Sequence, residues 1–298
     1  CILKILIIDD CCPYKSFNEI SIQKNIRIIK NHKNIGVGAS TIVGLREALN
    51  EESDFFIKMD ADGQHPAKYL KELIPYLLTT KKYELFLVKG SRFSFISSNT
   101  NIPIMRRIGS FCLEPIARAA LSYKGLTDIA NGFISMNKIT LKYLLSKKIN
   151  NKFEDRFLFE SSVLRACSNI GINIHEFPME TIYGKEWTSS MKSHTMIYPL
   201  LVFWFKSLLK RILFKYIYKL NLGSLFLISS LINCMFSILT LLISIIPSIN
   251  RNEYVSAGNA SGFIFLLLST IVLLSLFVLY DYFSKKPIKT IFFESFYE

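Results

Sequence analysis

Two aspartates, Asp60 and Asp62, are the residues of this chain whose spacing most directly implies chemistry. They follow the predicted apolar strand at 54–59, and Gly63 and Pro66 come next and break the strand. Because side chains of a strand alternate between two faces, carboxylates at i and i+2 leave the strand on the same side. Such paired oxygen ligands on a turn suit a divalent cation that also binds a diphosphate. The alternative is a pair of solvated loop carboxylates.

The segments around this pair indicate an α/β domain. The pattern predicts strands at 2–8, 26–29, 54–59 and 83–88, with helices at 36–50 and from Pro66 to about 77. Alternating strands and helices favour a mostly parallel sheet, in which ligands bind at the carboxyl ends of the strands. The polar residues that follow the predicted strands are Asp9, Asp10, Asp60, Asp62 and Arg92. We therefore expect them to share one edge of the sheet.

Beyond Arg92 the pattern is looser. It predicts helices at 104–121, 153–166 and 196–220, strands at 128–137 and 172–177, and a polar loop at 183–191. Asp128, Glu154 and Asp155 are candidate general bases for a hydroxyl acceptor. Glu154 and Asp155 equally suit the N-terminal charges of a helix, which the helix dipole stabilises. Glu160, further along the same predicted helix, is interpreted as structural.

The last third of the chain predicts a membrane anchor. The chain has 298 residues, of which 50% are hydrophobic, and residues 220–250 and 254–280 contain no charge. Each run exceeds the ~20 residues that a membrane-spanning helix needs. The 196–220 helix is amphipathic and suits the membrane interface. Lys and Arg flank both runs, so the positive-inside rule places both flanks in the cytoplasm and the 251–257 loop outside.

The distribution of charge indicates the class of binding partner, and the cysteines indicate the cellular compartment. The net charge is +13, and the basic residues cluster beside the predicted spans. This position favours anionic lipid headgroups as partners, and we expect no nucleic-acid partner. The six cysteines have no metal-type spacing and are interpreted as reduced thiols of a cytosolic domain.

Several motifs in order resemble the family 2 glycosyltransferases. They are IIDDCCPYKS, IGVGASTIVGLREAL, MDADGQHP, GSRF, DIANGFISMN, FEDRFLFESSVLRA and HEFPMETIYGKEWTSS. The order looks more closely like the dolichol-phosphate mannosyltransferase-like branch, which loads a sugar onto a polyprenyl phosphate. The resemblance covers residues 1–195, and the paired C-terminal spans match membrane-anchored members.

The resemblance implies a GT-A fold, a nucleotide-sugar donor, and Mg²⁺ or Mn²⁺ as cofactor. The residues that match the donor and metal motifs are Asp60, Asp62 and Gln64, with Asp9 and Asp10 toward the nucleoside, Gly36 and Gly38 in the glycine turn, and Arg92 in the GSR motif. Asp128 and the pair Gly132–Phe133 match the acceptor-side motif. The candidates for holding a lipid phosphate are Arg106, Arg107 and Lys192, with contact to lipid headgroups as the alternative.

Three departures from the family pattern affect the expectations. Ile134 stands where the family has an arginine, Val37 stands where it has a basic residue, and its first strand is missing upstream of Cys1. We therefore expect a fragment that lacks one strand. The expected organisation is a catalytic domain at 1–195, an interfacial helix at 196–220, a membrane hairpin at 221–285 and a cytoplasmic tail at 286–298.

These inferences together predict a membrane-anchored enzyme with two spans and a cytoplasmic catalytic domain. The predicted reaction transfers a hexose from a UDP- or GDP-linked sugar to a polyprenyl phosphate. The same fold could instead act on a saccharide acceptor, or the chain could be a non-catalytic membrane scaffold. A metal-binding soluble domain fused to an anchor for unrelated reasons is a further alternative. Homo-oligomer formation is left open.

Overall fold

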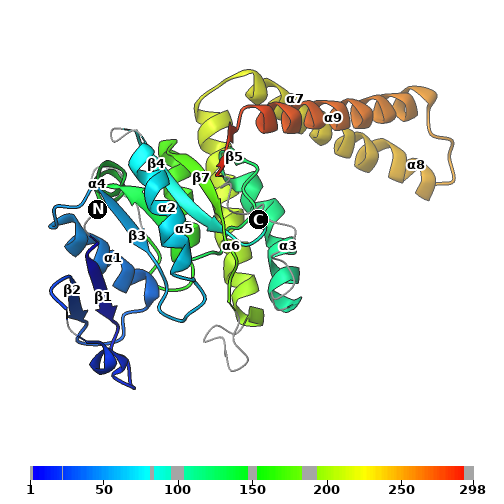
Figure 1. Ribbon diagram of the computed structural model, residues 1–298. Helices are drawn as coiled ribbons and strands as arrows, with labels where there is room; N and C mark the ends of the chain where they lie inside the picture. The colour runs from blue at the N-terminus through cyan, green and yellow to red at the C-terminus, as the bar shows by residue number, and fades with distance from the viewer. Residues whose placement is uncertain are drawn as a thin grey trace. The chain divides into compact units, whose positions relative to one another are not determined.

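The computed structural model describes residues 3–21, 23–80, 84–94, 104–146, 153–182 and 193–291. The chain divides into two compact units (Figure 1). The larger unit comprises Cys1–Ser207 and Pro287–Glu298, and the smaller unit comprises Leu208–Lys286. Each unit is described separately below.

The larger unit contains two principal sheets. The first is a parallel pair of β1 (Ile5–Asp9) and β2 (Ile26–Lys30). The second has the order β3-β6-β4-β7-β9. Its strands are β3 (Phe55–Lys58), β6 (Ile134–Asn137), β4 (Phe86–Ser91), β7 (Asn173–Pro178) and β9 (Lys289–Thr290).

Strand β6 is the exception in a sheet whose other strands all run the same way, as predicted, and it lies at the position that matters for the site. It is antiparallel to both β3 and β4, while β4, β7 and β9 are parallel to one another. An antiparallel strand starts at the edge where its neighbours end. The predicted strand at 128–137 begins only at Ile134, so residues 128–133 form a loop at the carboxyl edge of β3 and β4.

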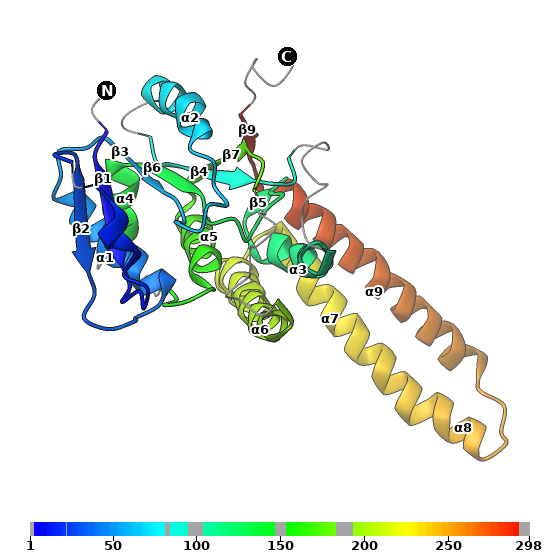
Figure 2. The ribbon, with the colours of Figure 1, turned by 60° about the horizontal axis from the view of Figure 1, so that its bottom comes forward.

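Helices cover both faces of the five-stranded sheet (Figure 2). Helix α2 (Lys68–Thr79) packs Tyr69, Leu73 and Leu77 onto one face, because residues four apart lie on one side of a helix. The opposite face is lined by helices α1, α4 and α5. The helices of this unit other than α2 are α1 (Val37–Leu49), α3 (Ile104–Ala120), α4 (Lys138–Leu145), α5 (Phe159–Ile170) and the first part of α6 (Ser193–Ile212).

The start of α5 differs from the prediction. The helix begins at Phe159 rather than at 153, so Glu154 and Asp155 lie in the loop before it. The carbonyl of Asp155 accepts a hydrogen bond from the Ala39 backbone (3.0 Å), which ties this loop to α1 instead of to a helical turn. Neither carboxylate is therefore in the first turn of a helix. The predicted polar loop at 183–191 lies outside the described residues.

The smaller unit is a helical hairpin. After the π-helical segment η4 (Leu213–Tyr218), helix α7 (Leu222–Thr240) continues through a second π-helical turn, η5 (Leu241–Ile245), into α8 (Ile246–Asn250), and α9 (Ala257–Phe283) returns beside it (Figure 2). The segments Leu222–Asn250 and Ala257–Phe283 are long and apolar enough to cross a membrane. Only 17% and 6% of their most apolar windows are buried, which is unlike a core helix of a soluble domain.

The prediction of an α/β domain followed by two apolar helices is confirmed. Polar contact between the two helices is also present, because the Asn233 amide donates to Ser269 Oγ (2.9 Å). Strand β9 was not anticipated. It lies within the segment expected to be a tail, and it pairs in parallel with β7 through His175 and Glu176.

Candidate active site

The two aspartates lie in a tight turn directly after β3. Asp62 Oδ1 accepts a hydrogen bond from the Gln64 backbone (3.0 Å), and the Asp60 backbone donates to His65 Nδ1 (3.2 Å). Gln64 and His65 are buried and anchor the turn. Burial of the His65 ring lowers its pKa despite the two carboxylates nearby. His65 is therefore a neutral acceptor that holds the Asp60 backbone.

Lys58 connects the metal-motif carboxylate to helix α5. Its Nζ lies 2.6 Å from Asp60 Oδ1 and 3.0 Å from Glu160 Oε1. The Lys58 and Glu160 side chains are about one-tenth exposed. Burial opposes the charge of Lys58, but the carboxylates of Glu160 and Asp60 outweigh it and raise the pKa of Lys58. Glu160, interpreted from sequence as structural, thus helps to hold Asp60 through Lys58.

Gly132 allows the loop before β6 to approach Asp60. A Cβ placed on Gly132 would lie 2.1 Å from Asp60 Oδ2 and 2.9 Å from Lys58 Nζ. No side chain fits at this position without displacing the carboxylate. The acceptor-side motif and the metal motif, which are about 70 residues apart in sequence, are therefore in direct contact.

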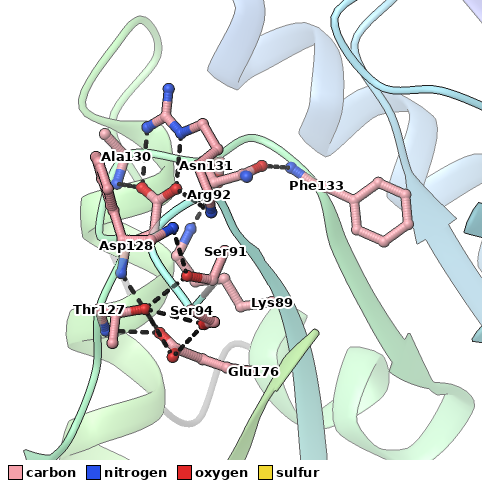
Figure 3. Close-up of polar contacts among 11 residues, drawn as sticks. Lys89, Ser91, Arg92, Ser94, Thr127, Asp128, Ala130, Asn131, Phe133 and Glu176 are labelled. Atoms are coloured by element: carbon pink, nitrogen blue, oxygen red, sulfur yellow. Dashed lines mark hydrogen bonds and ion pairs between the residues drawn. The ribbon is translucent and has the colours of Figure 1, made fainter. Parts of the chain in front are cut away.

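Arg92 and Asp128 form a buried, two-point ion pair at the same edge (Figure 3). Arg92 Nε donates to Asp128 Oδ2 (2.7 Å), and Arg92 Nη2 donates to Asp128 Oδ1 (2.9 Å). The Arg92 backbone also donates to Oδ2 (3.0 Å). Burial alone would raise the pKa of Asp128, but Arg92 lowers it to about 2. Asp128 therefore orients Arg92 and is too weak a base to deprotonate a hydroxyl group.

A second group of buried polar residues lies beside this pair (Figure 3). Glu176 accepts from the Thr127 backbone (2.7 Å) and from Thr127 Oγ1 (2.9 Å). Lys89 Nζ donates to the Asn131 carbonyl (2.6 Å). Burial lowers the pKa of Lys89 to about 8 and raises that of Glu176. Through these hydrogen bonds, Glu176 and Lys89 hold the two ends of the 127–131 segment.

Strand register explains why these charges meet. Lys58 of β3 pairs with Ile134 of β6, Ile134 pairs with Lys89 of β4, and Lys89 pairs with Glu176 of β7. Because paired residues share a face, the three charged residues form a row across the sheet, toward α5. Sequence reasoning missed this row. Its available signal was a charged residue inside an otherwise apolar strand, which a folded protein pairs or neutralises.

Asp9 and Asp10, which are predicted to lie toward the nucleoside, make different contacts in the structure. Asp10 Oδ1 accepts from Ile35 N (2.9 Å), and Oδ2 accepts from Gly36 N (2.8 Å). Burial opposes ionisation, but these backbone hydrogen bonds, together with side-chain hydrogen bonds to Asn31 and Ser40, outweigh it and lower the pKa of Asp10. Asp9 Oδ1 instead accepts from Cys12 N (2.9 Å) and closes a turn.

Gly36 and Gly38 have a packing role in this structure. A Cβ on Gly36 would lie 2.7 Å from the Asp155 carbonyl oxygen, and one on Gly38 would lie 2.2 Å from the Glu154 carbonyl oxygen. Gly36 also has φ = +94°, which favours glycine. The two glycines thus admit the loop before α5, and their predicted contact with the donor remains a prediction.

The remaining predicted residues are not brought into one group. Glu154 and Asp155 contribute backbone atoms to the α1 contact, and Asp155 is exposed. Arg107 is exposed on α3. The side chain of Arg106 and the whole of Lys192 lie outside the described residues, so their predicted role in holding a lipid phosphate stays a prediction.

The donor set of the aspartate turn fits a divalent cation of the Mg²⁺ or Mn²⁺ type. Among the described residues, no three His, Cys, Asp or Glu side chains gather as a ready metal site. The turn offers two carboxylates, and Asp60 is about one-third exposed. Mg²⁺ typically binds through one or two carboxylates and takes its other ligands from phosphates and water. Asp60 and Asp62 suit this mode, in which the metal would compete with Lys58 for Asp60.

Comparison with known proteins agrees with this geometry. Residues 2–145 match the family model described as glycosyl transferase family 2. The chain contains a family 2 glycosyltransferase domain. The aspartate turn, Arg92 and the 128–133 loop all lie within the matched part, whereas α5, β7 and the apolar helices follow it.

Three relatives are similar to this chain in sequence. A UDP-N-acetylglucosamine–dolichyl-phosphate N-acetylglucosaminyltransferase of Methanococcus voltae is 32% identical over 57% of this chain and 64% of its own length. An uncharacterised protein of Methanocaldococcus jannaschii is 28% identical over 60% of this chain and 70% of its own. A dolichol-phosphate mannosyltransferase of Pyrococcus furiosus is 30% identical over 45% of this chain and 38% of its own. The chain thus spans less than two thirds of the first and third relatives.

Proposed function

We propose that this protein is a membrane-anchored glycosyltransferase that transfers a hexose from a nucleotide-diphosphate sugar to a polyprenyl phosphate. The observation that carries the proposal is the contact of the 128–133 loop with Asp60, which brings the predicted acceptor-side motif next to the predicted donor-side turn. The names of two relatives support the acceptor class, since both names contain dolichol phosphate or dolichyl phosphate.

The residues divide the work of transfer as follows. Asp60 and Asp62 would hold a divalent cation, which supplies Lewis-acid stabilisation of the diphosphate leaving group when bound. Asp128 holds Arg92 in one orientation at the same edge. A preorganised cation beside a leaving group stabilises the charge that develops in the transition state. Gly132 keeps space beside the Asp60 carboxylate.

A phosphate acceptor matches the absence of a suitable base in the Arg92–Asp128 pair. A phosphate monoester has its second pKa near 6, so it is largely ionised at neutral pH. It therefore attacks without a general base, and the pKa of about 2 at Asp128 is no obstacle. This argument favours the lipid phosphate over a sugar hydroxyl.

A saccharide acceptor is the second candidate, and one residue favours it. Burial raises the pKa of Glu114 on α3 to about 7, although Arg118 lies 2.8 Å away. A carboxyl group with that pKa is suited to general-base catalysis at neutral pH. If the acceptor is a saccharide, Glu114→Gln should abolish transfer to it. If the acceptor is a phosphate, the same substitution should leave the transfer rate within a few-fold of wild type.

Strand β9 supports the proposed topology. Residues 289–290 follow both apolar helices, and they pair with β7, which precedes both. The two strands must therefore lie on the same side of the membrane, as two crossings require. The excess of Lys and Arg on this side favours the cytoplasm. Cysteine labelling at the 251–257 loop with an impermeant reagent in intact cells tests this orientation.

The experiment for the function uses the full chain in detergent or nanodiscs. It is incubated with UDP-N-acetylglucosamine, UDP-glucose or GDP-mannose and a short polyprenyl phosphate, with Mn²⁺ or with EDTA. Formation of a lipid-linked sugar with one donor, abolished by EDTA, supports the proposal. Transfer only to free oligosaccharides supports the second candidate. Donor binding without transfer to either acceptor contradicts both and supports a scaffold.

A further inference from the structure

An ion cluster at one end of the helical hairpin has no part in the proposed reaction. Its centre is Asp281, in the last turn of α9. Arg211 Nη2 and Nη1 donate to the two Asp281 oxygens (2.6 and 3.1 Å), and Tyr216 Oη donates to Oδ1 (2.5 Å). Lys215 Nζ and Lys285 Nζ lie 3.4 and 3.7 Å from the same carboxylate. All five residues belong to the smaller unit.

The cluster carries more positive charge than its own carboxylate neutralises. Three cations share one anion, so the group has a net charge of +2. Between Leu208 and Lys286 the sequence has one other acidic residue, Glu253. Glu253 precedes α9, whose 27 residues place it about 40 Å from Asp281. The smaller unit therefore cannot supply a second anion to the cluster.

The local environment makes this excess charge costly. Lys285 is buried. Burial, followed by repulsion from Arg211, lowers the pKa of Lys285 to about 8, and Asp281 offsets only part of this. Lys215 Nζ also donates to the exposed Ser284 Oγ (2.6 Å), which places this hydroxyl beside the cluster. An added anion there would relieve the repulsion.

The depth of the cluster indicates which anion it meets. Asp281 lies two residues before the end of an apolar helix, and Lys285 lies two residues after it. In a membrane this is the level of the lipid headgroups, where phosphate is the abundant anion. Arg211 already uses its planar fork on Asp281. Lysine binds phosphate as a point charge, which leaves this role to Lys215 and Lys285.

We propose that Lys215, Lys285 and Ser284 form a binding site for the phosphate of an anionic phospholipid. The bound phosphate completes the charge balance of the cluster and fixes the segment 211–216 against the end of α9. This inference depends on insertion of the hairpin into a membrane and not on glycosyl transfer. Its test therefore remains valid if the proposed reaction is wrong.

The test measures lipid binding to the full chain in detergent by native mass spectrometry and by thermal shift. The probes are phosphatidylglycerol, zwitterionic phosphatidylcholine and a short polyprenyl phosphate. The variant is Lys215→Gln/Lys285→Gln, in which Arg211 and Tyr216 still pair with Asp281. The charge-matched control is Lys24→Gln/Arg251→Gln, at an exposed loop and at the far end of the hairpin.

The expected result is preferential binding of phosphatidylglycerol to the wild type and the control. The double lysine variant should lose about 30-fold of this preference, or about 2 kcal/mol, since one lysine near an anionic surface contributes about 1 kcal/mol. Equal binding of the two phospholipids by the wild type would overturn the proposal. So would an unchanged preference in the variant, or a response to polyprenyl phosphate alone, which would assign the site to the acceptor.

Discussion

Replacement of Gly132 by alanine is the sharpest test of the contact between the acceptor loop and the metal turn. The new Cβ would lie 2.1 Å from Asp60 Oδ2, whereas ordinary contacts begin at 3.4 Å. The carboxylate must therefore move by roughly 1 Å, and a displacement of about 1 Å in an active site costs about 100-fold in rate. This corresponds to about 2.7 kcal/mol of transition-state stabilisation.

The fold should tolerate this substitution. The atoms that the new methyl group meets are the ends of the Asp60 and Lys58 side chains, not the backbone. Gly132 is not one of the glycines with positive φ, so alanine introduces no backbone strain. We expect Gly132→Ala to lower kcat/KM for nucleoside-diphosphate release about 100-fold and to weaken Mn²⁺ binding, measured by electron paramagnetic resonance. The unfolding temperature should change by only a few degrees.

Gly109→Ala is the matched control, because no atom lies within 4 Å of its Cβ position in helix α3. It should keep full activity and gain about 0.5–1 kcal/mol of stability from the better helix former. The reasoning fails if Gly132→Ala retains activity within threefold of the wild type with unchanged Mn²⁺ affinity. It also fails if the variant loses activity only because it unfolds.

Three further predictions concern charges at the same edge. Lys58→Met should tighten Mn²⁺ binding about tenfold, because it removes a cation that competes with the metal for Asp60. Glu160→Gln should weaken Mn²⁺ binding about tenfold, because Lys58 then pairs with Asp60 more strongly. Shifts of both variants in the same direction would contradict this reasoning. Asp62→Asn should reduce transfer 100-fold or more, and EDTA should reproduce the loss; transfer within a few-fold of wild type argues against a metal role. The pKa of Asp128 in the folded state, about 2, lies below its value in the unfolded chain, about 3.8. The ion pair therefore contributes about 2 kcal/mol to the free energy of unfolding above pH 3.8, and this contribution is lost as the pH falls through about 2. Asp128→Asn should flatten this acid dependence in thermal unfolding.

The positions of Asp60, Asp62 and Arg92 at one edge of the sheet could be predicted because that information is local. The Asp60–Asp62 spacing, the break at Gly63 and the position after an apolar run all concern neighbouring residues. The same holds for Arg92 after β4. Apolar runs longer than a membrane span are likewise visible without any tertiary contact.

The parts that could not be predicted depend on pairing between distant segments. Nothing within residues 134–137 indicates that β6 runs against β3 and β4, because a short apolar run has no direction. The row formed by Lys58, Lys89 and Glu176 exists only once three strands are in register. The late start of α5 follows from the approach of its preceding loop to Gly36 and Gly38, which overrides the local preference for helix.

The order of strands in the sheet also constrains how the protein is made. Strand β4 is buried along its whole length, yet its partners β6 and β7 begin only at Ile134 and Asn173. A nascent chain that ends before Ile134 therefore exposes an apolar strand with no partner, a state prone to aggregation. Strand β9 is synthesised after both apolar helices. The sheet can be completed only after both apolar helices have been synthesised, and under the proposed topology this places membrane insertion before the last step of folding.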